Sequence, residues 1–552
     1  MLRCGPEHGT GLTWEWWIVE LQADIAVIGG GMGGVSAALA ALEAGRRVVL
    51  TEQTRWLGGQ LTSQLVPTDE HRYIENDGAN RSYRRLRDGL REHYRRNFPL
   101  TDAARADPHL NPGHAWVSPV SVDPRVAVSV IDDLLMPYLA ADRLVVLRET
   151  APVAIATDSD RVTAVRVRTA SGDEIDITAP YVLDATELGD LLPMAQVEHV
   201  SGRESQEQTG EPGAWPTADP TDMQGVSWCF ALDHLAGEDH TIDRPEDYDY
   251  WRDLRPPQLD GRRILSFGEP VTPEGKPGRV YTLNPNPDDD VIDLDHRNMG
   301  LAPELWNYRR IAVRRFFSPG FFRSDVVVVN WPMNDYVGGP LFGVPEAEHH
   351  WHQAKALSRS LVYWLQTDAP RPDGGTGWPG MRLRADVAGT EDGFAMYPYI
   401  RESRRILALK TIVEQEISTA YRGDGGSERY PDSVGTGHYY WIDRHHTTGD
   451  GRGAGGTPHP FEIPLRALIP RRLRNLLPAA KNIGTTQITN GAYRLHPVEW
   501  SIGEAVGALA AYCLDNGTEP HAVVAAADAV EDFQRVLTAR GVQLRWAEDK
   551  RW

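Results

Sequence analysis

The segment Ala23-Asp-Ile-Ala-Val-Ile-Gly29-Gly30-Gly31-Met-Gly33-Gly34 indicates the fold more clearly than any other part of the chain. Its apolar run is short and typical of a strand buried in a parallel sheet, and the alanine- and leucine-rich residues 35–44 favour a helix. Gly45 stands where a helix-terminating glycine is expected, and residues 47–52 have the pattern of a second strand. The sequence therefore predicts a strand, a tight turn, a helix and a second parallel strand.

The glycines of this turn fit a dinucleotide-binding fingerprint, in which each glycine has a separate mechanical task. Gly29 lets the chain reverse, the missing side chain of Gly31 lets backbone amides reach a pyrophosphate, and Gly34 lets the helix lie close to the strand. Glu52 follows about 20 residues later, at the end of the second strand, where a carboxylate can accept hydrogen bonds from ribose hydroxyls. This context predicts a dinucleotide site.

A chain of 552 residues is longer than one hydrophobic core usually organises, so we expect more than one packed domain. Residues 161–178 alternate apolar and polar side chains around Ser171-Gly-Asp, which predicts a β-hairpin, and residues 502–513 are expected to form a late helix. The expected divisions are an N-terminal extension at 1–22, a discontinuous nucleotide-binding domain at 23–200 and 460–520, an inserted α+β substrate domain at 201–459 and a C-terminal helical tail at 521–552.

The composition argues against several classes of partner and site. A formal net charge of −20 does not favour binding to nucleic acid or to an anionic membrane surface. It is compatible with a small-molecule substrate. Three scattered cysteines are too few for a disulfide framework or metal cluster, and His349, His350 and His352 lack a defined ligand spacing. No apolar run reaches the roughly 18 residues of a spanning helix. We expect a soluble, cytoplasmic protein without a metal site; its oligomeric state stays open.

The residues after Glu52 carry a family resemblance. Gln53-Thr-Arg-Trp-Leu-Gly58-Gly59-Gln60-Leu-Thr62-Ser63 resembles the signature of FAD-dependent oxidoreductases of the glutathione-reductase-like superfamily, and more closely the group often labelled putative xanthan lyases. Asp184-Ala185-Thr186-Glu187 is similar to the second FAD-contacting segment of that family, with glutamate where many members have glycine. The resemblance extends along most of the chain. It implies FAD as the cofactor and an α/β fold in which a Rossmann-like FAD-binding domain carries an inserted substrate domain.

A late segment strengthens the resemblance. Thr489-Asn-Gly491-Ala-Tyr-Arg494-Leu-His496-Pro497-Val-Glu499 resembles the family stretch that runs beneath the isoalloxazine ring, although Ala480 and Glu499-Trp500 depart from the usual pattern. A loop leading into a helix at Ser501 would place amide donors near the charge of a reduced flavin. The residues expected to bind FAD are Gly29, Gly31, Gly33, Gly34, Glu52, Gly58, Gly59, Gln60, Thr62, Ala185, Thr186, Gly491, Pro497 and Gly503.

Four side chains are candidates for chemistry beside the flavin. Arg494 suits stabilisation of a reduced flavin or of a substrate carboxylate, and His496 suits a general base. His445 and His446 adjoin Asp443, so one of them is an alternative base. The expected reaction is oxidation of a small organic molecule by hydride transfer to the flavin, which dioxygen or another acceptor reoxidises. A flavin monooxygenase or halogenase, or a catalytically silent flavin-binding subunit, is the alternative.

Overall fold

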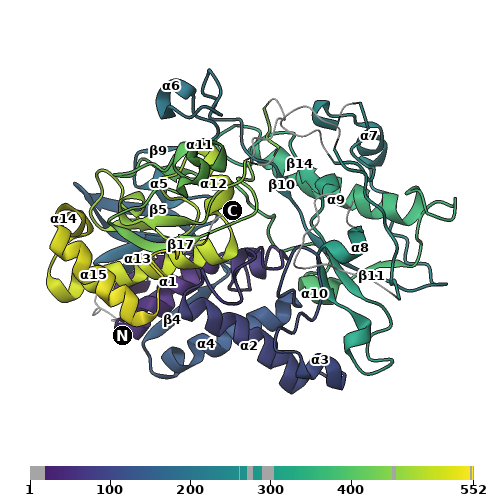
Figure 1. Cartoon of the computed structure of the whole chain (residues 1–552), viewed down its shortest axis with the longest axis horizontal. Helices are drawn as coiled ribbons and strands as arrows, with labels where there is room; N and C mark the ends of the chain where they lie inside the picture. The colour runs from purple at the N-terminus through teal and green to yellow at the C-terminus, as the bar shows by residue number, and fades with distance from the viewer. Residues whose placement is uncertain are drawn as a thin grey trace, which may run out of the picture.

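The computed structural model describes residues 19–259, 261–269, 278–288, 304–444, 446–449, 456–547 and 550 (Figure 1). Its main sheet is parallel throughout and has the strand order β19-β8-β2-β3-β4. These strands are β2 Ile25–Ile28, β3 Val48–Glu52, β4 Leu144–Arg148, β8 Tyr181–Asp184 and β19 Leu476–Pro478. All residues of β2, β3, β8 and β19 are buried, as the apolar runs predict for a parallel sheet. The predicted strand–turn–helix–strand unit is thus confirmed.

Helix α1 (Met32–Glu43) follows the glycine turn, residues 29–34, and packs against α13 (His496–Asn516). Figure 1 shows the two helices side by side, although they come from opposite ends of the sequence. Their backbones touch, because a Cβ atom on Gly503 would lie 2.0 Å from the carbonyl oxygen of Gly33. Any side chain at position 503 would force the helices apart.

Helix α13 begins earlier than the sequence predicts. The expected loop before Ser501 is helical from His496, with Leu495 as the N-cap and Pro497 in the first turn. Proline fits there because the first helical N–H groups have no partner within the helix and the proline φ angle is already helical. Ser501 is therefore inside the helix, and the expected amide donors at its start lie one turn earlier. This expectation was wrong.

A second sheet has the order β1-β7-β6-β5, with β1 Val19–Gln22, β5 Thr150–Asp158, β6 Arg161–Thr169 and β7 Glu174–Thr178. Strands β6 and β7 form the predicted hairpin, and Gly172 adopts the positive φ of +92° that its turn requires. Strand β1 was expected to belong to an N-terminal extension. It pairs in parallel with β7, so the end of that expected extension continues this sheet.

A separate hydrophobic core lies among residues 188–400, around Trp306, Trp331 and Phe230. The sheet β12-β13-β11-β15 has the strands Arg310–Ala312, Val326–Val329, Phe230–His234 and Met381–Leu383. One face of β11 and β13 packs into this core together with the long helix α9 (Ala347–Thr367). Figure 1 shows these elements on the side of the molecule away from α14 (Pro520–Ala525) and α15 (Ala527–Arg540). Helices α2 (Arg81–Asn97) and α4 (Pro124–Ala140) pack together beside the main sheet. No helix in the described ranges is long and apolar enough to span a membrane.

The contact between α1 and α13 leads to a stability prediction. Gly503→Ala should lower the free energy of unfolding by about 1–3 kcal/mol, because the new methyl group meets a backbone oxygen that cannot move alone. In an uncrowded helix the same change would stabilise by roughly 0.5–1 kcal/mol. Gly425→Ala is the matched control, since nothing lies within 4 Å of a Cβ atom there. Urea denaturation of both variants measures the effect, and equal stability of Gly503→Ala and the parent chain would contradict the packing argument.

Candidate functional site

The glycine turn lies at the carboxyl end of β2, where β8 and β3 also end. Gly29 has a φ angle of +104°, and a Cβ atom on it would lie 2.2 Å from the carbonyl oxygen of Ala185. Gly31 is the N-cap of α1 and provides no side chain to cap the first helical amides. The turn therefore presents backbone N–H groups and the positive end of the helix dipole at the edge of the sheet.

Glu52 lies beside the turn, as the sequence predicts for the end of the second strand. One of its carboxylate oxygens accepts the Gly30 N–H at 3.0 Å, and the other accepts the backbone and hydroxyl donors of Thr54 at 2.8 and 2.7 Å. Burial raises the pKa of Glu52 to about 7. The carboxylate is thus hydrogen-bonded to the glycine turn. It lies where it can bind a polar group of a ligand that occupies the turn.

The signature after β3 folds back onto the turn. Gly58 donates its N–H to the Gly30 carbonyl at 2.7 Å, and the short helix η1 (Gly59–Leu61) follows. Thr62 donates its hydroxyl to Leu57, which closes this turn. Ala185 and Thr186 lie against the glycine turn from β8, with Thr186 hydrogen-bonded to Asp184. The structure therefore brings the early predicted segments together at one edge of the sheet.

Three buried charged side chains lie against this turn. Lys481 Nζ is 2.5 Å from Glu187 Oε2 and 3.9 Å from Glu499 Oε2. Glu499 Oε1 accepts the Gly33 N–H at 3.3 Å, and Gln60 Nε2 donates to Glu499 Oε2 at 2.6 Å. Sequence reasoning missed Lys481. The sequence feature that could have identified it is the rarity of lysine, because the chain has only five lysines and its other Lys/Arg side chains are arginines.

A second polar group, which we call the Arg494 group, consists of Arg494, Tyr399 and Asp443. Arg494 is buried, and it donates to the Tyr399 hydroxyl at 2.6 Å and to the Asp443 carboxylate at 2.9 Å. Burial raises the pKa of Tyr399, so the phenol stays protonated at neutral pH. Gly491, in α12 (Gln487–Tyr493), permits the backbone of Asp443 to pass over that helix, because a Cβ atom would lie 2.5 Å from the Asp443 carbonyl carbon. Tyr399 carried no motif that could have singled it out.

His496 occupies a different environment from the one expected of a base. Its Nδ1 accepts the Asp69 N–H at 3.1 Å, and its Nε2 lies 3.1 Å from the Val66 carbonyl, to which the neutral ring donates. Burial lowers the pKa of His496 to about 4. Because backbone groups engage both ring nitrogens, this geometry favours a role in positioning residues 66–69. His445 lies outside the described residues, and the backbone carbonyl of His446 accepts the Gly225 N–H at 2.7 Å.

The glycine turn and the Arg494 group are connected through Gln60. Its Nε2 donates to the Arg494 carbonyl at 3.2 Å as well as to Glu499, while its Oε1 has no hydrogen-bond partner in the described part of the chain. The same is true of Gln64 Nε2 and Arg494 Nε. Buried polar atoms normally have partners. A strip of unsatisfied donors and acceptors therefore runs from the turn towards Arg494.

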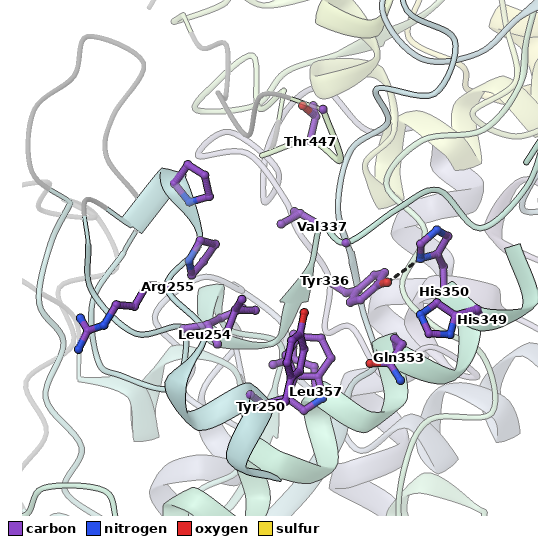
Figure 2. Close-up of a pocket in the computed structure, with 16 residues that line it drawn as sticks. Tyr250, Leu254, Arg255, Tyr336, Val337, His349, His350, Gln353, Leu357 and Thr447 are labelled. Atoms are coloured by element: carbon purple, nitrogen blue, oxygen red, sulfur yellow. Dashed lines mark hydrogen bonds between the residues drawn. The ribbon is translucent and has the colours of Figure 1, made fainter. Parts of the chain in front are cut away.

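A cavity of about 330 Å³ lies elsewhere, beside β14 (Asp335–Tyr336). In Figure 2 the Tyr336 hydroxyl points towards His350, and it lies 2.7 Å from the ring nitrogen Nδ1. Leu254 and Tyr250 lie in the lower part of the view and Thr447 at its top. Successive residues of a strand point to opposite faces. Asp335, the neighbour of Tyr336, binds Arg401 at 2.8 Å. Strand β14 thus separates this cavity from Arg401 and the Arg494 group.

Comparison with known proteins identifies the family. The model of the FAD dependent oxidoreductase family matches residues 24–537. The chain belongs to this family. Its cofactor is FAD. No curated protein matches the chain.

Several solved structures are similar to parts of this chain. E. coli quinol fumarate reductase FrdA is 13% identical over 94% of this chain and 74% of its own, with a TM-score of 0.31. The L-proline dehydrogenase from P. horikoshii is 16% identical over 34% of this chain and 25% of its own, with a TM-score of 0.17. The myxobacterial chondrochloren halogenase CndH is 17% identical over 40% of this chain and 45% of its own, with a TM-score of 0.21. The chain thus spans less than half the length of the last two proteins.

The residues at the glycine turn fit FAD. The glycines of the turn have no side chains of their own to block a pyrophosphate, Glu52 lies at the end of β3, and Gln60 and Gln64 hold buried polar atoms without partners in the described ranges. These residues would hold the dinucleotide and meet the polar edge of its ring system. Among the described residues, no group of three or more His, Cys, Asp or Glu side chains could hold a metal ion.

The turn geometry leads to a prediction about cofactor content. Gly31→Val should weaken FAD binding by roughly 10- to 100-fold, because its side chain enters the space that the phosphates need. Gly425→Val is the control, since position 425 is uncrowded. The visible absorbance of each purified protein relative to its absorbance at 280 nm measures the bound flavin, and mass spectrometry of the released cofactor distinguishes FAD from FMN. Full FAD content in Gly31→Val would mean that the phosphates lie elsewhere.

Proposed function

We propose that the chain is a dehydrogenase or oxidase that removes hydride from a small organic molecule. FAD, when bound, supplies the hydride acceptor, which dioxygen or another oxidant returns to the oxidised state. We also propose that residues 201–459 form a substrate domain and that the chain belongs to the glutathione-reductase-like superfamily. The Arg494 group is the observation that carries the proposed oxidation.

Arg494 can bind an oxygen-rich or anionic substrate. Its guanidinium is buried and already held in place by Tyr399 and Asp443, while its Nε donor has no partner within the described residues. A preorganised guanidinium binds carboxylate oxygens with little further loss of side-chain freedom. We therefore expect a substrate that carries a carboxylate or hydroxyl group. The same cation can stabilise negative charge on the reduced ring system.

A proton acceptor is needed as well, because removal of hydride from an alcohol or amine leaves a cation unless a proton is also lost. The carboxylate of Asp443 is 36% exposed and lies 2.9 Å from Arg494, so it contacts both the buried group and solvent. We propose Asp443 as the acceptor, with His446 of the same loop as the alternative. His496 then holds residues 66–69 behind the site.

The reaction class can be tested with a panel of candidate substrates. The purified protein is mixed without oxygen with hydroxy acids, amino acids, alcohols, amines and sugars in turn, and flavin absorbance is followed. Bleaching by at least one compound, with product two hydrogens poorer than substrate, supports the proposal. Incorporation of an oxygen atom or a halogen into product would favour the monooxygenase or halogenase instead, and a complete lack of turnover would favour the silent subunit.

Substitutions can separate the role of Asp443 from that of His496, the base that the sequence favoured. Asp443→Asn should keep bound FAD yet slow anaerobic flavin reduction by at least roughly tenfold, because a positioned base usually contributes about 100- to 10,000-fold. His496→Asn tests the base that the sequence favoured, and we expect it to change stability more than the reduction rate, because backbone groups engage both ring nitrogens of His496. Stopped-flow absorbance gives both rates, and thermal unfolding gives the stability. A large rate loss confined to His496→Asn would assign the proton to His496.

A further inference from the structure

Glu499 occupies the position at the glycine turn that an anion is expected to take. It comes from the first turn of α13, is almost completely buried, and accepts the Gly33 N–H at 3.3 Å. Helix N-termini bind anions because their amides lack partners and the dipole is positive there. A carboxylate of the protein itself therefore occupies the helix N-terminus at which the glycine fingerprint would place a pyrophosphate.

Glu187 adds a second carboxylate to the same place. A Cβ atom on Gly31 would lie 2.9 Å from Glu187 Oε1 and 3.4 Å from Glu499 Oε1, so the two side chains face the same point of the turn. Lys481 is the cation between them, at 2.5 and 3.9 Å. With both carboxylates ionised, the cluster carries one net negative charge. Adding a doubly charged pyrophosphate to it would be strongly unfavourable in a buried site.

Lys481 is the main positive charge that acts on Glu499 within the described residues. It favours the ionised form of Glu499, whereas Glu187 disfavours that form, and hydrogen bonds from Gly33 and Gln60 favour it. Behind Glu187 lie two more carboxylates, Glu52 and Asp190, the latter paired with Arg404. Burial is the largest influence and raises the pKa of Glu499 to about 7. Glu499 can therefore exchange a proton near neutral pH.

We propose that FAD binding transfers one proton from solvent to Glu499, whose neutral carboxyl group then leaves the Gly33 amide to the pyrophosphate. Lys481 then remains as the cation of the cluster. The proton adds to a carboxylate oxygen and no other bond changes. The inference rests on FAD as the cofactor and not on the proposed oxidation. It can therefore fail while the proposed oxidation is correct, and it can hold while the proposed oxidation is wrong.

The affinity for FAD should fall as the pH rises through the pKa of Glu499. At pH values well below the pKa of Glu499, the protonated form predominates in the FAD-free protein, so affinity does not depend on its proton. At pH values well above that pKa the ionised form predominates, so each bound FAD draws one proton from solution. The dissociation constant should then rise by up to about tenfold per pH unit.

The experiment dilutes the FAD-loaded protein at pH values from 5.5 to 9 and measures free FAD by its fluorescence. The parent chain should show the rise described above. Glu499→Gln should bind FAD with an affinity that changes less than about twofold over this range, and more tightly than the parent at pH 8.5. Glu504→Gln is the matched control. Glu504 is a buried glutamate of the same helix that accepts from Asn80 and Ser82 away from the turn, so its variant should keep the parent slope.

Two further variants make the result decisive. Lys481→Met should weaken FAD binding at every pH by at least roughly tenfold, since it removes the cation of the cluster. Glu499→Thr replaces Glu499→Gln if circular dichroism shows that the latter is unfolded. A flat profile for the parent chain overturns the proposal, as does an unchanged slope in the Glu499 variant. Loss of the slope in Glu187→Gln, with retention in the Glu499 variant, overturns the assignment to Glu499.

Discussion

The backbone contact between α1 and α13 is the constraint on which the remaining structure depends. Gly503 and Gly507 of α13 lie directly against the backbone of Gly33 and Ala37 in α1, so no side chain separates the two helices at these positions. This approach brings residues 491–499, from the end of the chain, to a turn formed near its beginning. Glu499 can reach the Gly33 amide, and Gln60 can reach both Glu499 and the Arg494 carbonyl, only because the helices are this close.

Local patterns predicted the parts of the fold that local interactions determine. The buried run before Gly29, the glycine at position 45 and the hairpin around Gly172 all lie where the sequence indicated, because turn geometry and sheet burial leave few alternatives there. The start of α13 differs from the prediction, because a proline fits a loop and also the first turn of a helix, where Pro497 is the second residue. Strand β1 gave no local signal, because only its distant partner β7 stabilises it.

The site was predictable in position but not in electrostatics. Spacing located the turn and Glu52, yet the meeting of Glu187, Lys481 and Glu499 depends on three segments that are distant in sequence. Tyr399 and Asp443 likewise reach Arg494 from separate loops. In a buried site of low dielectric constant, the contacts between such side chains determine which of them are charged. The chemistry of the site therefore depends on tertiary structure.

The completion of the main sheet by β19 has a consequence for biosynthesis. Strand β8 ends at Asp184, whereas its neighbour β19 begins at Leu476, roughly 300 residues later. At typical elongation rates of about 5–20 residues per second, a ribosome needs roughly 15–60 s to cover that interval. The edge of β8 stays unpaired during this time, with backbone groups that could pair with another strand. Nascent chains on neighbouring ribosomes are therefore exposed to mispairing at this edge, and a chaperone that shields β8 would raise the yield of folded protein.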